Sequence, residues 1–90
     1  MGIAAVKIKV LPTSPEIDLE RLKEALTKMV EDKGGKNCTI EAEPIAFGLE
    51  ALIVFFAWPE EKELENLEES MGKLEEVSSI QVIDMRRALG

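Results

Sequence analysis

The sequence predicts an α+β fold in which two helices cover one face of a four-stranded antiparallel sheet. Four segments have the hydrophobicity pattern of strands, and two have apolar residues at the spacing of a helix. Proline and glycine separate them in the order strand, helix, strand, strand, helix, strand. In a chain of 90 residues this order is typical of the ferredoxin-like two-layer sandwich. The length fits one domain, which we expect to span residues 1–90.

The first expected strand covers Ala4–Leu11, where apolar and polar residues alternate. Such alternation indicates a strand with one buried face, here formed by Val6, Ile8 and Val10. Pro12 and Pro15 are expected to end this strand, because proline cannot donate a hydrogen bond to a sheet.

The first expected helix begins at Asp18, whose carboxylate can accept backbone N–H groups of the first turn. Apolar side chains then recur at spacings of three and four and form one stripe: Leu19, Leu22, Leu26, Met29 and Val30. Gly34 and Gly35 are expected to end the helix.

Two strand patterns follow in succession. The segment Asn37–Glu43 alternates but is polar, so we expect it near an edge of the sheet. The segment Leu49–Trp58 is almost wholly apolar, which predicts a central strand covered on much of both faces. Its aromatic residues are expected to pack in the core: Phe55, Phe56 and Trp58.

The second helix is expected at about Glu60–Glu76, since it carries an apolar stripe among many charged residues. Its carboxylate pairs, such as Glu60 with Glu61, indicate a solvated face. Residues 77–79 are expected to turn the chain into a last strand, Ile80–Met85, with Arg86 and Arg87 in a tail beyond it.

Composition excludes several classes of function. The net charge of −7 repels phosphate backbones and argues against direct nucleic-acid binding. Histidine is absent, so the serines have no histidine base, and Cys38 is the only cysteine. We therefore expect no catalytic residues, no enzymatic activity, no metal site and no cofactor. There is no apolar run of about 18 residues and no signal-peptide pattern, so we expect a cytoplasmic protein without a membrane span.

Two features remain for function. The segment Glu43–Gly48, EPIAFG, is apolar although it connects two strands, where loops are usually polar. Its Phe47 either folds back into the core or is offered to a partner, and spacing alone does not choose between these. The pair Arg86 and Arg87 reverses the local charge of an acidic chain, either as a solubilising end or as a contact.

Both features, together with the segments PTSPEIDLERLKEAL, EPIAFGLEAL and DMRRAL, resemble the archaeal elongation factor 1-beta family. The resemblance covers nearly the whole chain. Eukaryotic relatives carry a related proline–isoleucine–glycine–phenylalanine–glycine segment, in which Ala46 here replaces the first glycine.

The resemblance implies a monomeric guanine-nucleotide exchange factor that binds GDP-bound elongation factor 1-alpha and promotes GDP release and GTP loading. It implies that Phe47, flanked by Ile45 and Gly48, enters an apolar pocket of this GTPase. It also implies that a basic residue near the C-terminus reaches the Mg²⁺ and phosphate region. Arg87 matches this residue and Arg86 is the second candidate. Eukaryotic members carry lysine there, and whether arginine acts as a point charge or as a bidentate fork stays open.

Two other functions remain as alternatives. A ferredoxin-like domain can also form a regulatory homodimer that binds a small molecule between its subunits. An RNA-binding module of this fold would need aromatic residues on its first strand, which instead carries Lys7 and Lys9. We expect these lysines on the open face of the sheet, where they would widen an interface with a partner.

Overall fold

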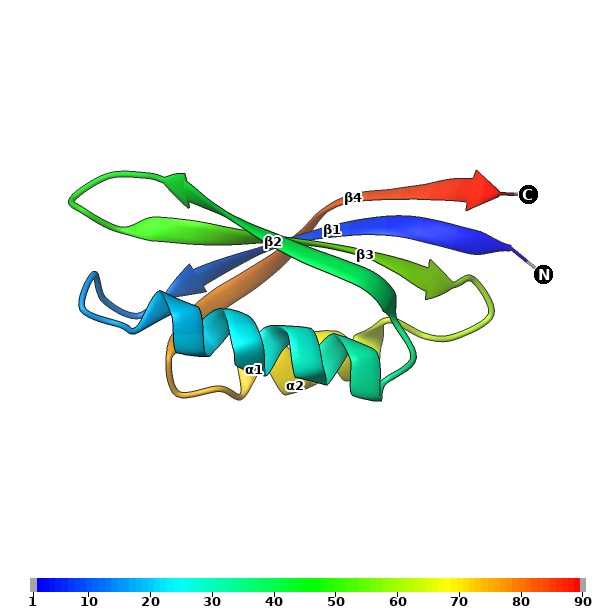
Figure 1. The fold of residues 1–90 in the computed structure, drawn as a ribbon, viewed down its shortest axis with the longest axis horizontal. Coiled ribbons are helices and arrows are strands. Elements are labelled where there is room, and N and C mark those ends of the chain that lie inside the picture. Colours follow the sequence, from blue (N-terminus) through cyan, green and yellow to red (C-terminus); the bar gives the residue numbers. More distant parts are fainter. Residues whose placement is uncertain (1, 90) are drawn as a thin grey trace.

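The computed structural model describes residues 2–89, and Figure 1 shows them as two layers, with both helices on the same face of a sheet. The elements follow the predicted order: β1 (Ile3–Pro12), α1 (Leu19–Asp32), β2 (Lys36–Pro44), β3 (Glu50–Pro59), α2 (Glu65–Gly72) and β4 (Val77–Leu89). The predicted ferredoxin-like α+β class is thus confirmed. Met1 and Gly90, the two ends of the expected domain, lie outside the described residues.

The sheet has the strand order β2-β3-β1-β4, and each neighbouring pair is antiparallel. The apolar strand β3 is central, as predicted, because both of its edges are paired. The more polar strand β2 is at an edge, also as predicted. Within residues 2–89, neither helix is long and apolar enough to cross a membrane.

The core lies between the sheet and the helices. Alternate residues of β1 are fully buried against it, as their spacing predicts. From the apolar stripe of α1, Leu22, Leu26 and Val30 are fully buried, while the other two residues are partly buried and pack against the core. From β3, Phe56 and Trp58 pack edge to face, with ring centroids 5.8 Å apart, so these two aromatics are core residues as expected. Each fully buried large apolar side chain stabilises the fold by about 1.5–3 kcal/mol. Phe55 lies on the opposite face of the sheet, level with Lys7.

Helix α1 has the predicted boundaries. The Oδ1 atom of Asp18 accepts the backbone N–H of Arg21 at 3.2 Å, which confirms Asp18 as the N-cap. At the other end Gly34 has φ of +106°, a conformation that favours glycine, and Gly35 donates to the carbonyl of Val30 at 2.9 Å.

Helix α2 is shorter than the sequence predicts, and it begins five residues later. The residues after Pro59 form a turn in which Glu60 donates its backbone N–H to Gly2 and Lys62 donates to Pro59. The Nε1 atom of Trp58 donates to the carbonyl of Lys62 at 3.1 Å. The bond from Glu60 to Gly2 ties this turn to the residue before β1, and the other two bonds hold residues 58–62 in a local turn, so the apolar periodicity that begins at Leu64 becomes helix only from Glu65.

Strand β4 is longer than predicted at both ends. Residues 77–79, expected to turn, belong to the strand, as do Arg86 and Arg87, expected in a tail. The cause is β1, a strand of ten residues that offers register partners from Val77, opposite Pro12, to Leu89, opposite Ile3. Three register irregularities let the longer strand follow the shorter one.

Candidate functional site

The connection between β2 and β3 is a tight turn at one end of the sheet. Leu49 donates its backbone N–H to the carbonyl of Ala46 at 3.1 Å, and Ile45 donates to Leu49 at 2.9 Å. The two central residues, Phe47 and Gly48, have φ of +60° and +78°. Positive φ at both central positions is the pattern of a type I′ hairpin turn, which favours asparagine and glycine there. A phenylalanine at the first of these positions is conformationally unfavourable.

Phe47 projects from this turn into solvent. Its exposed fraction is 95%, whereas the backbone on either side is held by the hydrogen bonds of the hairpin. The side chain therefore does not fold back into the core, one of the two possibilities that the sequence leaves open. Ile45 has an exposed fraction of 37%. It lines a shallow depression of about 300 Å³ on the open face, together with Lys9, Leu11, Ser79 and Gln81.

The two arginines lie near the end of β4 and pair with different carboxylates. The Nε atom of Arg87 lies 2.7 Å from Oε2 of Glu60 in the turn after β3. The Nε atom of Arg86 lies 3.1 Å from Oδ2 of Asp84 on its own strand. Their register partners on β1 are consecutive, Ala4 for Arg87 and Ala5 for Arg86, so the two side chains leave the sheet on opposite faces.

Phe47 and the arginines are at opposite ends of the molecule. Figure 1 shows the β2–β3 turn at one end of the long axis and the C-terminal end of β4 at the other. In the sheet register Arg87 is level with Trp58, while the turn joins β3 at Glu50. Trp58 is eight positions beyond Glu50 along β3, a distance of about 26 Å at about 3.3 Å per residue. The predicted site residues therefore lie in two separate regions of the molecule.

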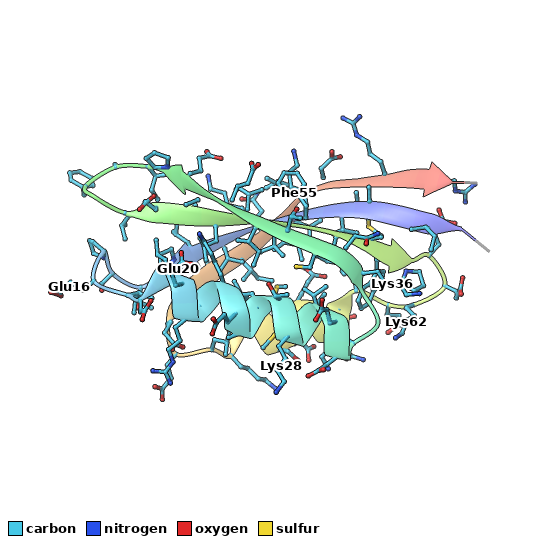
Figure 2. The ribbon with its side chains drawn as sticks, viewed as in Figure 1. Glu16, Glu20, Lys28, Lys36, Phe55 and Lys62 are labelled. Carbon is cyan, nitrogen blue, oxygen red and sulfur yellow. The ribbon has the colours of Figure 1, made fainter. Side chains whose placement is uncertain are left out.

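The face of the sheet away from the helices lies between these regions. Lys7 and Lys9 are on this face, as strand parity predicts, and are half-buried. The ammonium of Lys7 lies 4.7 Å from the centroid of the Phe55 ring, a cation–π distance. Figure 2 shows Phe55 on the side of the sheet away from both helices. Sequence reasoning placed Phe55 in the core because a continuous apolar run does not reveal which side a residue faces.

Glu60 is the residue that sequence reasoning missed. It was assigned to the solvated face of a helix, but it lies before α2 and pairs with Arg87 across 27 positions of sequence. No local pattern signals this contact, because it depends on the turn after β3 meeting the end of β4.

A metal centre and a reactive cysteine are the other kinds of site that the residue types of this chain could form. Within residues 2–89, no three cysteine or acidic side chains come together so as to hold a metal ion. Cys38 on β2 is half-buried, with its Sγ 3.9 Å from the hydroxyl of Thr27 on α1. Burial raises the pKa of the Cys38 thiol; the hydrogen bond with Thr27 lowers it in part, and the nearby carboxylate of Glu31 raises it again. A thiol with a raised pKa is a poor nucleophile at neutral pH.

Comparison with known proteins identifies the family of this chain. Residues 5–88 match the family model described as EF-1 guanine nucleotide exchange domain. The elongation factor 1-beta of Methanococcus maripaludis is 41% identical over 87 residues, covering 94% of this chain and 97% of the relative. That of Methanobrevibacter smithii is 40% identical over 90 residues, covering 99% and 100%. That of Methanosarcina acetivorans is 42% identical over 88 residues, covering 97% and 99%.

Proposed function

This chain belongs to the family of EF-1 guanine nucleotide exchange domains, and we propose that it acts on its GTPase through two contacts, one at each end of its sheet. Its function is that of a translation elongation factor that promotes GDP release and GTP loading on elongation factor 1-alpha. The family membership does not favour a small-molecule-binding homodimer. Nucleotide exchange makes and breaks no covalent bond, so we assign no catalytic residue and no cofactor to this chain.

The first contact is the β2–β3 turn, and one observation carries it: Phe47 is 95% exposed in a left-handed backbone conformation. Both the exposed ring and the unfavourable φ destabilise the free protein, and such features are concentrated at functional positions. An aromatic side chain that enters an apolar pocket supplies much of the binding energy of an interface. We assign Ile45 to the rim of this contact and Gly48 to the backbone conformation that presents Phe47.

The second contact is the end of β4, where Arg87, with Arg86 as the second candidate, addresses the Mg²⁺ and phosphate region of the GTPase. Exchange follows from linkage. If the factor binds the GTPase more tightly when Mg²⁺ and GDP are absent, it must weaken nucleotide binding by the same factor. A coupling of about 3 kcal/mol corresponds to a change in affinity of roughly a hundredfold.

The remaining properties are proposals of the same kind. Residues 1–90 act as one exchange domain, as a monomer, in the cytoplasm where translation takes place. The form of the GTPase that is engaged first is the GDP complex, because that is the substrate of exchange. The net charge of −7 argues against direct contact with nucleic acid.

The test is release of fluorescent GDP from a matching elongation factor 1-alpha in excess unlabelled nucleotide. We expect the release rate to rise with added protein and to saturate. The same titration with the Arg87→Ala variant should reach a lower maximal rate at a similar half-saturating concentration, because Arg87 acts on the nucleotide side. An equal loss in both quantities would reduce Arg87 to a docking residue.

A further inference from the structure

Glu60 is held firmly where the turn after β3 meets the end of the sheet. Its backbone N–H donates to the carbonyl of Gly2 at 3.0 Å. Its carboxylate fills the space beside Gly2, where the Cβ atom of any other residue would collide with it. The exposed fraction of the Glu60 side chain is 26%, against 84% for Glu20, which forms an ion pair with Lys23 on the surface of α1. Glu60 is thus a fixed acceptor at this end of the molecule.

Arg87 uses only part of its guanidinium in the contact with Glu60. The Nε atom donates at 2.7 Å, while the side chain remains 69% exposed. A guanidinium has five N–H donors, of which four are on the two terminal nitrogens. In the part of the chain that the structure describes, the Arg87 side chain makes no other hydrogen bond or ion pair. The terminal nitrogens are therefore left for an acceptor outside this protein.

We propose that Glu60 is a positioning residue, which orients Arg87 so that its terminal nitrogens bind a pair of anionic oxygens of the GTPase complex. This inference rests on the proposed function and deepens it. Glu60 neutralises the charge of Arg87, so the pair is a weaker competitor for a cation site than a free lysine would be. The fork that binds a carboxylate or phosphate bidentately is retained. The structure thus favours hydrogen bonding to an oxyanion over displacement of Mg²⁺ by a point charge.

The test measures GDP release with variants of Glu60 and Arg87. Glu60→Ala should lower the maximal rate about three- to fivefold, the range of a partly exposed charge pair, with little change in the half-saturating concentration. Glu60→Gln keeps an oxygen acceptor for Nε and should recover part of the loss. Glu61→Ala is the matched control, since it removes an adjacent carboxylate of the same turn, and should exchange at the unmodified rate.

The double variant Glu60→Ala/Arg87→Ala distinguishes positioning from a structural role. If Glu60 acts through Arg87, the double variant should exchange at the rate of Arg87→Ala alone. A further three- to fivefold loss of the release rate in the double variant would overturn the inference. So would an unchanged or faster release rate for Glu60→Ala when Arg87→Ala is slow. An unchanged rate for Arg87→Ala would instead contradict the role of Arg87 in the proposed function.

The source of the oxyanion is identified by measuring how tightly the unmodified protein and the Arg87→Ala variant bind the GTPase with and without GDP. If the acceptor is a carboxylate of the GTPase, Arg87→Ala should lose affinity mainly for the nucleotide-free form, because by linkage a contact that promotes GDP release is stronger when GDP is absent. If it is a phosphate of the nucleotide, the loss should appear only with GDP; Arg87 would then favour retention of GDP, which would contradict its role in the proposed function. A loss in neither form would show that Arg87 binds no oxyanion and would overturn the inference.

Discussion

At the scale of single residues, the backbone and the side chain of Phe47 point to the same conclusion. Left-handed φ costs a non-glycine residue about 1–2 kcal/mol, and Phe47 adopts φ of +60° beside a glycine that could take this conformation without cost. Its ring gains nothing from packing within this protein, because 95% of it is exposed. A residue that is unfavourable in both respects for the free protein is understandable if its stabilising contacts are made with a partner.

Phe47→Gly should stabilise the free protein by about 1 kcal/mol and weaken binding to the GTPase by about tenfold or more. The stability gain comes from the relief of the unfavourable φ, and the binding loss comes from removal of the ring. Thermal melting and a binding titration measure the two effects. Phe56→Ala is the matched control, since the same ring is 4% exposed there and its loss should cost about 3–5 kcal/mol. A melting temperature lowered by Phe47→Gly would show that the ring packs within the fold.

Cys38 offers a prediction that depends mainly on its burial. Because burial raises the pKa of its thiol, less thiolate is present near pH 8 than in an exposed cysteine. Alkylation by iodoacetamide at this pH should be about threefold or more slower than for free cysteine, and the rates should converge in denaturant. The folded protein binds the thiol proton of Cys38 more tightly than the unfolded chain does. The protonated thiol therefore makes its full contribution to the stability of the fold below the pKa of the unfolded state. This contribution is lost as pH rises through the folded pKa. Equal alkylation rates in the folded and unfolded protein would contradict this.

At the scale of elements, the connection between β3 and α2 joins three parts of the fold. Lys62 extends its ammonium to the carbonyl of Lys33 just after α1, while its own carbonyl accepts the indole N–H of Trp58. The ammonium also lies 5.5 Å from the centroid of the Trp58 indole ring. Figure 2 shows Lys62 beside the loop that follows β3. The turn thus closes the end of α1, and it holds Glu60 where Arg87 can reach it.

Lys62→Met should destabilise the protein by about 0.5–1 kcal/mol, since methionine keeps the apolar stem but cannot donate to the carbonyl of Lys33. Urea denaturation measures the free energy of unfolding. The control is Lys28→Met on the exposed side of α1, which should change stability by less than about 0.5 kcal/mol. Equal effects of the two substitutions would show that the contact with Lys33 contributes nothing.

At the scale of the whole molecule, the sheet separates the two proposed contacts. The long axis of the protein measures 42 Å, and the β2–β3 turn and the C-terminal end of β4 lie near its two ends. Paired strands do not stretch, so the separation of the contacts is a fixed property of the fold. A rigid spacer of this length suits a factor that binds one surface of its partner while acting at a second.

Because the two contacts are far apart and share no neighbour, their effects should add. The variant Phe47→Ala/Arg87→Ala should lose the sum of the single-variant free energies to within about 0.5 kcal/mol. Phe47→Ala should act mainly on the half-saturating concentration and Arg87→Ala mainly on the maximal rate of GDP release. A double variant no worse than Phe47→Ala alone would show that the two contacts form only together, as one cooperative unit.

The sequence identifies residues of the candidate site but not their exposure or their pairing. Phe47 stood out because an apolar segment between strands is unusual, and Arg86 and Arg87 because they oppose the charge of the chain. Glu60 could not be found, since its meaning depends on an ion pair between segments that are distant in sequence. The exposure of Phe47 was equally undetermined, because an apolar turn is compatible with either orientation of its ring.

The sequence by itself determined the order of the elements, the central position of β3, the N-cap at Asp18 and the core faces of β1 and α1. These follow from local periodicity and from the chemistry of proline, glycine and capping carboxylates, which act within a few residues. Only the tertiary structure decided the late start of α2, the extension of β4 through Arg87 and the pairing of Arg87 with Glu60. Each of these depends on hydrogen bonds or register between strands and turns that are far apart in sequence, and local periodicity carries no information about such partners.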